Sequence, residues 1–245
     1  MEHQEQIRFI PGSRDCVLLI HGICGTPRHF RELLPVIPED TSFYNILLDG
    51  HGQDVAAFSQ TSMEKWHAQV ETVVERILSR HQRVFMVAHS MGTLFAIRAA
   101  VAHPDRIRGL LLLAVPTRPR LRVGTLVSCL KVAWGRVTPE DGRAWAMHEA
   151  CSIRQTRKLW KYLGWIPRFW ELLAECRRVR KLLPGLTTRT WVFQSRVDEL
   201  VSFRARKDLE NLPSVSCTVL EDSGHFSYGR EDMAQICRAL AEMLR

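Results

Sequence analysis

The chain has 245 residues, of which 46% are hydrophobic and 24% are charged, and its formal net charge is +8. This length allows one domain with a sizeable buried core, and the composition excludes a disordered protein. The first fifteen residues lack the apolar stretch of a secretion signal, and the longest apolar run, 110–115, is far shorter than the ~20 residues that cross a bilayer. We therefore expect a soluble, cytoplasmic protein.

Seven cysteines and ten histidines could suggest a metal or redox site, but their arrangement does not. The cysteine count is odd, no pair has C-x-x-C spacing, and the histidines are scattered. The glycine patterns of dinucleotide-binding and phosphate-binding loops are also missing. We therefore expect free thiols, no metal and no cofactor.

Short apolar runs alternate along the chain with helical patterns. Each run has four to seven residues and ends in turn-forming or small polar residues, which is typical of strands buried on both faces of a parallel sheet. A buried helix segment is the alternative for any single run, but six in regular alternation favour strands. The runs are Cys16–Ile20, Tyr44–Leu48, Val84–Ala88, Leu110–Val115, Thr190–Gln194 and Val215–Leu220.

Helical patterns occupy the gaps between these runs. The clearest is Thr61–Arg80, whose apolar residues fall on one helical face. Thr61 or Ser62 can cap the start of this helix. Strands alternating with helices predict an α/β fold with a mostly parallel, doubly wound sheet flanked by helices, and a ligand site at the carboxyl ends of the strands. The other expected helices are Thr93–Val101, Phe203–Leu212 and Glu231–Leu244.

The loop after the first run reads His21-Gly22-Ile23-Cys24-Gly25-Thr26. Its glycines allow backbone amides to point at one spot, as an oxyanion hole requires. The alternative is an ordinary turn in which Thr26 caps a helix and Pro27 takes its first position. Both can hold together, with the Ile23 amide offered to a substrate.

The third run leads directly into Ala88-His89-Ser90-Met91-Gly92. A sharp strand-to-helix turn lifts a serine hydroxyl above the sheet, and it requires small residues two before and two after the serine. Ala88 and Gly92 meet that requirement, although glycine is the usual residue at the first position. The alternative is that Ser90 only caps the following helix.

The segment 116–185 breaks the alternation, because it has no strand-like run. It contains five of the seven tryptophans and fifteen Lys and Arg against five Asp and Glu, which leaves the remainder with a net charge of −2. We therefore predict an α/β core formed by 1–115 and 186–245 and a helical insertion at 116–185, called the cap below.

Two titratable residues follow the last two runs. Asp198 lies four residues after one run and His225 follows the other, so serine, aspartate and histidine come in the order that an α/β-hydrolase needs. Either could instead be a solvated loop residue. Glu199 and Asp222 are rival acids, and Asp222 is too near His225 on the same loop to reach its ring easily.

These motifs resemble those of the lid-bearing α/β-hydrolase family of bacterial carboxylesterases and monoacylglycerol lipases. The resemblance extends from about residue 17 to the end of the chain, apart from the cap, and implies that Ser90, Asp198 and His225 are a catalytic triad. It also implies that Ile23 and Met91 supply the oxyanion-hole amides. The matching motifs are His21-Gly22 with Gly25-Thr26, Leu48-Asp49-Gly50-His51-Gly52, Ala88-His89-Ser90-Met91-Gly92, Asp198 with Val201, and Ser223-Gly224-His225.

We expect a serine carboxylesterase that acts on small or medium acyl esters, with monoacylglycerols among the candidates. Gly22, Cys24 and His89 are expected to contact the substrate. An aminopeptidase, an amidase or a thioesterase could use the same triad, and a non-catalytic binding protein of this fold is the remaining alternative.

The role of the cap is open at this point. Its tryptophans and leucines could line an acyl pocket or simply pack its helices on the sheet. Its basic surface could contact anionic lipid weakly or be a solvated face, and we expect no nucleic-acid partner because no binding module is recognisable.

Overall fold

The computed structural model of the protein describes residues 3–120 and 123–245. Its centre is a seven-stranded sheet with the order β1-β3-β2-β4-β5-β6-β7, in which β1 is antiparallel to β3 and all other neighbours are parallel. Six strands occupy the six predicted runs, so the mostly parallel sheet is confirmed. The strands are β1 (Gln6–Arg8), β2 (Asp15–Ile20), β3 (Ser42–Ile46), β4 (Arg83–His89), β5 (Ile107–Leu113), β6 (Thr190–Ser195) and β7 (Val215–Leu220).

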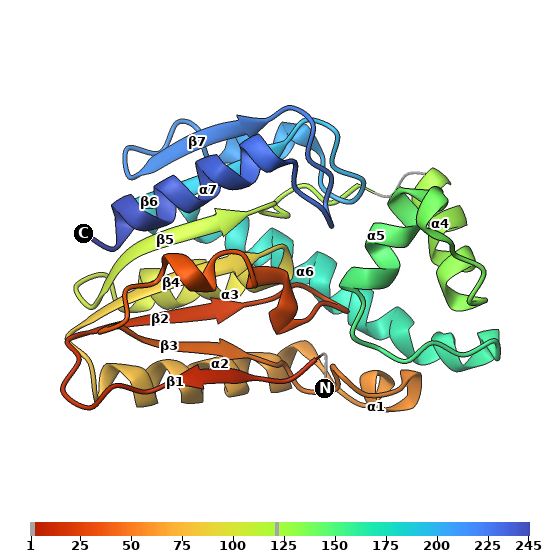
Figure 1. The fold of residues 1–245 in the computed structure, drawn as a ribbon, viewed down its shortest axis with the longest axis horizontal. Coiled ribbons are helices and arrows are strands. Elements are labelled where there is room, and N and C mark those ends of the chain that lie inside the picture. Colours follow the sequence, from red (N-terminus) through yellow and green to blue (C-terminus); the bar gives the residue numbers. More distant parts are fainter. Residues whose placement is uncertain (1–2, 121–122) are drawn as a thin grey trace.

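Helices cover both faces of this sheet (Figure 1). On one face, α2 (Met63–Leu78), α3 (Met91–Ala102) and α6 (Ile166–Leu182) bury apolar residues in the larger core cluster. On the other, α7 (Arg230–Met243) packs with two 3-10 helices, η1 (Pro27–Phe30) and η2 (Leu34–Val36). Side chains along β2 alternate between the two clusters, which explains why its run is continuously apolar.

Three local elements differ from the sequence expectations. The edge strand β1 was not expected, because its three residues carry no apolar run, and neither was the short helix α1 (Val55–Ser59), which Asp54 caps. The helix expected at 203–212 is shorter than predicted and is not an α-helix. A 3-10 helix, η6 (Phe203–Asp208), lies there, and Leu209 N donates to Arg206 O three residues back.

In the part of the cap that the structure describes, short loops join a series of helices, and apart from two isolated β-bridges no strand is present. Figure 1 shows α4 and α5 beyond the carboxyl ends of the strands, whereas α6 packs back against α3. Cys176 and Val179 of α6 belong to the larger core cluster, so the last third of the cap helps to cover the sheet. The elements are α4 (Val123–Ala133), η3 (Pro139–Asp141), α5 (Arg143–Ala150), η4 (Leu159–Trp165), α6 and η5 (Leu183–Gly185). The domain boundaries stay a prediction.

Backbone hydrogen bonds tie the cap to the loops that leave the sheet. Ser152 N donates to Cys24 O (2.9 Å) in the loop after β2, and Arg154 N donates to Gln53 O (2.8 Å) in the loop after β3. Thr125 Oγ1 donates to the carbonyl of Glu199 (3.2 Å) in the loop after β6. The cap therefore lies at the sheet edge where the predicted site residues emerge.

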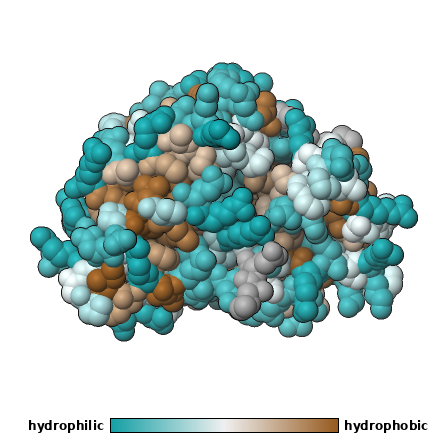
Figure 2. Space-filling model, in the orientation of Figure 1, coloured by the Kyte–Doolittle hydropathy of each residue, from teal (hydrophilic) through white to brown (hydrophobic). Residues whose placement is uncertain are grey.

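Among residues 3–120 and 123–245, no helix is long and apolar enough to cross a membrane. The face shown in Figure 2 is mostly hydrophilic, with apolar residues gathered in separate patches. The cytoplasmic location stays a prediction.

Candidate active site

Ser90 lies at the sharp turn between β4 and α3. Its backbone has a φ of 50°, a conformation that side-chain-bearing residues seldom adopt. A Cβ added to Gly92 would approach Ile20 O to 2.1 Å, so the turn tolerates only glycine there. The small residues expected around the serine therefore have a steric cause in the packing of the turn on β2.

The Ser90 hydroxyl does not cap the helix that it precedes. Ser90 occupies the N-cap position of α3, but its side chain makes no capping hydrogen bond. Its Oγ lies instead 3.1 Å from His225 Nε2. The geometry thus argues against the capping interpretation and places the hydroxyl beside an imidazole.

Asp198 meets the other side of the same ring. Its Oδ2 lies 2.8 Å from His225 Nδ1, and its Oδ1 accepts from the amides of Leu200 (2.7 Å) and Val201 (2.6 Å). Burial would raise the pKa of Asp198, but His225 and the two amides hold it below its usual value. An ionised carboxylate on Nδ1 fixes the tautomer that leaves Nε2 free to accept the Ser90 proton.

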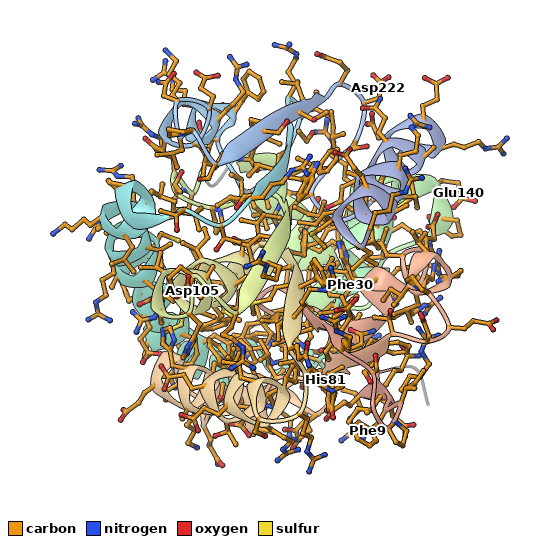
Figure 3. The ribbon with its side chains drawn as sticks, turned by 90° about the vertical axis from the view of Figure 1, so that its left-hand side faces the viewer. Phe9, Phe30, His81, Asp105, Glu140 and Asp222 are labelled. Carbon is orange, nitrogen blue, oxygen red and sulfur yellow. The ribbon has the colours of Figure 1, made fainter. Side chains whose placement is uncertain are left out.

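The two rival acids are placed differently. Asp222 is exposed at the outer edge of the molecule (Figure 3). Glu199 is buried, but its Oε2 accepts from the backbone N–H of His225 (2.6 Å) rather than from the ring. Of the three candidate acids, only Asp198 contacts the imidazole ring of His225.

The Glu199 contacts were not anticipated from the sequence. A Cβ added to Gly224 would lie 2.8 Å from Glu199 Oε1, so the glycine before His225 makes room for this carboxylate. Arg143 of the cap lies 3.7 Å from the same oxygen. Glu199 therefore touches both the histidine loop and the cap, and the only sequence signal was an acid directly after Asp198.

His89 also contacts His225 through the backbone. Its ring is buried, stacks on His29 with centroids 3.9 Å apart, and donates from Nε2 to the carbonyl of His225 (3.0 Å). Burial lowers the pKa of His89 well below its usual value and that of His29 to about 3. Both rings are therefore neutral at ordinary pH. The Nε2 atom of His89 is therefore engaged with His225. The expected contact of His89 with the substrate stays a prediction.

The loop after β2 lies against the serine. A Cβ on Gly22 would come within 2.9 Å of Ser90 Cβ, so this glycine permits the close approach. Gly22 O accepts from Gly25 N (3.0 Å) and from His21 Nδ1 (2.8 Å), and Thr26 caps η1 through the amide of Arg28. Cys24 follows with a φ of 57°. The loop therefore caps a helix and also adjoins Ser90.

Among the described residues, no group of three or more His, Cys, Asp or Glu side chains is arranged to hold a metal ion. The seven cysteines are unpaired. The groups that meet at the site are the Ser90 hydroxyl, the two ring nitrogens of His225 and the Asp198 carboxylate.

Comparison with known proteins identifies a family. The sequence pattern of the family described as "Serine aminopeptidase, S33" matches residues 11–225, which is most of the chain. A thermostable monoacylglycerol lipase from a Bacillus species is 33% identical over 92 residues, which cover 36% of this chain and 36% of that protein. A pimeloyl-[acyl-carrier protein] methyl ester esterase from Neisseria meningitidis is 31% identical over 120 residues, covering 46% and 34%. The chain thus spans about a third of the length of these curated relatives.

Solved structures support the fold over the whole chain. A structure described with LipS and LipT, two metagenome-derived lipolytic enzymes, has a TM-score of 0.72 at 19% identity and covers 99% of this chain and 97% of its own. A monoacylglycerol lipase from Paleococcus ferrophilus has a TM-score of 0.68 at 18% identity, with coverage of 99% and 100%. The α/β-hydrolase fold expected from the sequence is confirmed.

Proposed function

Because the chain belongs to the serine aminopeptidase S33 family of α/β-hydrolases, we propose that it is a serine hydrolase that cleaves carboxylic esters. The observation that carries the proposal is the line of contacts from Ser90 Oγ through the His225 ring to Asp198, 3.1 and 2.8 Å long. A strained serine at a strand-to-helix turn, joined to a buried imidazole and carboxylate, fits nucleophilic acyl transfer.

In the proposed reaction, Ser90 Oγ attacks the acyl carbonyl while its proton passes to His225 Nε2. Asp198 accepts the Nδ1 hydrogen bond and stabilises the imidazolium without taking a proton itself. The tetrahedral intermediate collapses, and the leaving alkoxide takes the proton from Nε2. Water then attacks the acyl-enzyme, giving its proton to His225, and the carboxylic acid and free Ser90 are released.

The Ile23 and Met91 amides are proposed to hold the oxyanion. Met91 is the first residue of α3, where a helix leaves its N–H groups unpaired. The Ile23 N–H belongs to the same trans peptide as the Gly22 carbonyl, which faces Gly25 N and His21. The N–H must therefore point to the opposite side. Such a donor contributes about 10²–10³ in turnover when aimed at the developing charge.

Glu199 and His89 are proposed as positioning residues for the base. Glu199 accepts from the amide of His225 and His89 donates to its carbonyl, so the peptide groups on both sides of the residue are held. Together with Asp198 on the ring, these contacts fix His225 against both translation and rotation. Neither residue touches the reacting atoms.

The proposed substrates are esters of small or medium acyl chains, with monoacylglycerols included. The similarity to a monoacylglycerol lipase and to a methyl ester esterase supports ester chemistry. The cap is proposed to line the acyl site, since it is bonded to the loops around Ser90 and its helix α5 carries the half-buried Trp145.

An aminopeptidase is the second candidate, because the family description names that activity. A substrate ammonium group would need an acidic anchor near Ser90. The buried Glu199 carboxylate is already bonded to His225 N, and the cap carries a large excess of Lys and Arg. These features favour an uncharged or anionic substrate over a cationic one.

The test is a panel of p-nitrophenyl esters from acetate to palmitate, assayed beside aminoacyl p-nitroanilides. We expect kcat/KM to be highest for an ester of small or medium chain length, with the anilides hydrolysed far more slowly. Faster hydrolysis of the anilides would replace the esterase proposal with the peptidase. Hydrolysis of neither class would contradict both proposals and leave a thioesterase or a non-catalytic protein of this fold.

A further inference from the structure

The cap exposes large apolar side chains that lie in one line. Trp160, Leu163 and Trp170 are 66%, 64% and 65% exposed, and nine of the eleven exposed large apolar residues among the described ones lie in the cap. Exposed apolar surface of this extent marks a contact site in most proteins.

Helix geometry explains why these side chains share a side. The 3-10 helix η4 leads directly into α6, and with about three residues per turn it places Trp160, Leu163 and Ile166 above one another. From Ile166 the α-helical spacing of three and four residues keeps Phe169 and Trp170 on that side. These five residues are called the apolar stripe.

The segment that carries the apolar stripe is rich in positive charge. Residues 150–170 include five Lys and Arg and no Asp or Glu, and only Arg168 of the five forms a salt bridge among the described residues, with Glu171. Arg157 and Lys158, at the start of η4, are exposed.

Arg157 also lines a cavity of about 320 Å³ together with Arg136 and Trp134 from the end of α4. Two guanidinium groups beside an indole suit a phosphate ester.

We propose that the apolar stripe and the cations Arg136, Arg157 and Lys158 form a docking surface for an anionic phospholipid bilayer. Tryptophan and leucine on one side of a helix, flanked by Lys and Arg, is the composition of helices that lie in the membrane interface. The apolar side chains enter the headgroup region, and the cations meet the lipid phosphates.

Charge complementarity favours a bilayer over the other occupants. In a symmetric dimer built on this surface, the same cations would face their own copies and repel one another. An acidic protein would neutralise the cations, but it has no reason to cover five exposed apolar side chains. Only an anionic lipid surface offers negative charge and an apolar interior side by side.

Docking has a consequence for the site that rests on the proposed function. The cap lies at the carboxyl edge of the sheet (Figure 1), so a protein bound through the stripe brings that edge toward a surface that contains lipid-derived esters. The binding itself does not depend on catalysis, so it is measured with full-length Ser90→Ala protein.

The experiment is sedimentation with vesicles of phosphatidylcholine alone or mixed with phosphatidylglycerol. We expect binding to the mixed vesicles, weaker binding to the neutral ones, and a loss of affinity as salt is added. Removing three cations in the variant Arg136→Gln, Arg157→Gln, Lys158→Gln should weaken binding about 100-fold, since each cation near such a surface contributes about fivefold.

The apolar part is tested with Trp160→Ser combined with Leu163→Ser, which should weaken binding about tenfold or more. Each variant has a matched control outside the cap. One control removes three exposed cations near the end of the chain, and the other removes one exposed apolar residue of the α/β domain. Both controls should bind the vesicles as the parent protein does. They are the triple variant Arg230→Gln, Arg238→Gln, Arg245→Gln and the single variant Ile7→Ser.

Three results would overturn the proposal. One is equal binding of the charge variant and its control to phosphatidylglycerol vesicles. Another is a lipid-independent dimer that the stripe variant abolishes, which would assign the surface to a second copy. The third is binding to polyglutamate but not to vesicles. In wild-type background the stripe variant should still hydrolyse a soluble p-nitrophenyl ester, so failed docking and failed hydrolysis are separate outcomes.

Discussion

At the carboxyl edge of the sheet the reacting side chains are polar and buried, whereas on the cap large apolar side chains face solvent. Asp198 and His225 are 3% and 2% exposed and contact each other, while most of the Trp160 side chain is exposed. Burying a carboxylate costs free energy unless hydrogen-bond partners are held in place around it. The side chains at the sheet edge are therefore restricted to one arrangement. The second region is free to meet a partner. We therefore propose that the sheet edge performs the chemistry and that the cap selects the partner.

The largest expected effect separates the regions by activity. Replacing Ser90 with alanine should reduce ester hydrolysis about 10³-fold or more with the fold retained, because members of such a unit act together. Hydrolysis of a p-nitrophenyl ester and labelling by a fluorophosphonate measure the effect. The control is Ser79→Ala, which changes an exposed serine at the C-terminal end of α2. An active alanine variant, or labelling at another serine, would remove Ser90 from the mechanism.

The next prediction concerns the acid. Asp198→Asn should lower kcat about 10³-fold, because an amide no longer fixes the reactive tautomer of His225. Asp222→Asn, on the exposed side of the same region, should leave kcat unchanged. Equal losses in both variants would contradict the assignment that the geometry suggests.

A stability comparison sharpens the contrast between the two regions. Trp66 is fully buried and donates to Asp49 O (2.8 Å), so Trp66→Ala should lower the free energy of unfolding by about 3–5 kcal/mol. Trp160→Ala should change it by no more than about 0.5 kcal/mol. Denaturant unfolding of both variants measures the difference. Comparable losses would mean that the cap tryptophan is packed rather than exposed.

The next prediction concerns the hydrogen bond between the Glu199 carboxylate and the backbone N–H of His225. Glu199→Leu leaves the buried His225 amide without an acceptor, so kcat should fall about 10–100-fold with KM little changed. Glu199→Gln still offers an oxygen and should recover most of the loss. Arg143→Gln, which removes only the cap contact, is the control. Failure of the glutamine to rescue would show that its charge, and not its hydrogen bond, is needed.

The smallest expected effect is on selectivity. Trp145 of α5 is half-buried, and Trp145→Ala should change the ratio of kcat/KM for long and short acyl esters by about tenfold or less. Trp170→Ala, on the exposed stripe, is the matched control and should leave the ratio as it is. A chain-length profile that neither variant alters would argue that the cap does not line the acyl site.

The sequence alone could predict the sheet and the candidate site to a large extent. Continuous apolar runs identify strands buried on both faces, and Ala88 and Gly92 reveal the steric demand of the turn around Ser90. The order of serine, aspartate and histidine along the chain follows the order of the strands. Such signals are local, because each depends on residues within one turn or one strand.

Contacts between distant segments were decided only by the tertiary structure. The pairing of Glu199 with the His225 amide, the stacking of His89 on His29 and the packing of α6 on α3 each join residues far apart in the chain. The edge strand β1 forms only because β3 offers it a partner, since its own residues are mostly exposed. Periodicity specifies which face of an element is apolar, but the neighbour that covers that face depends on how the whole chain folds.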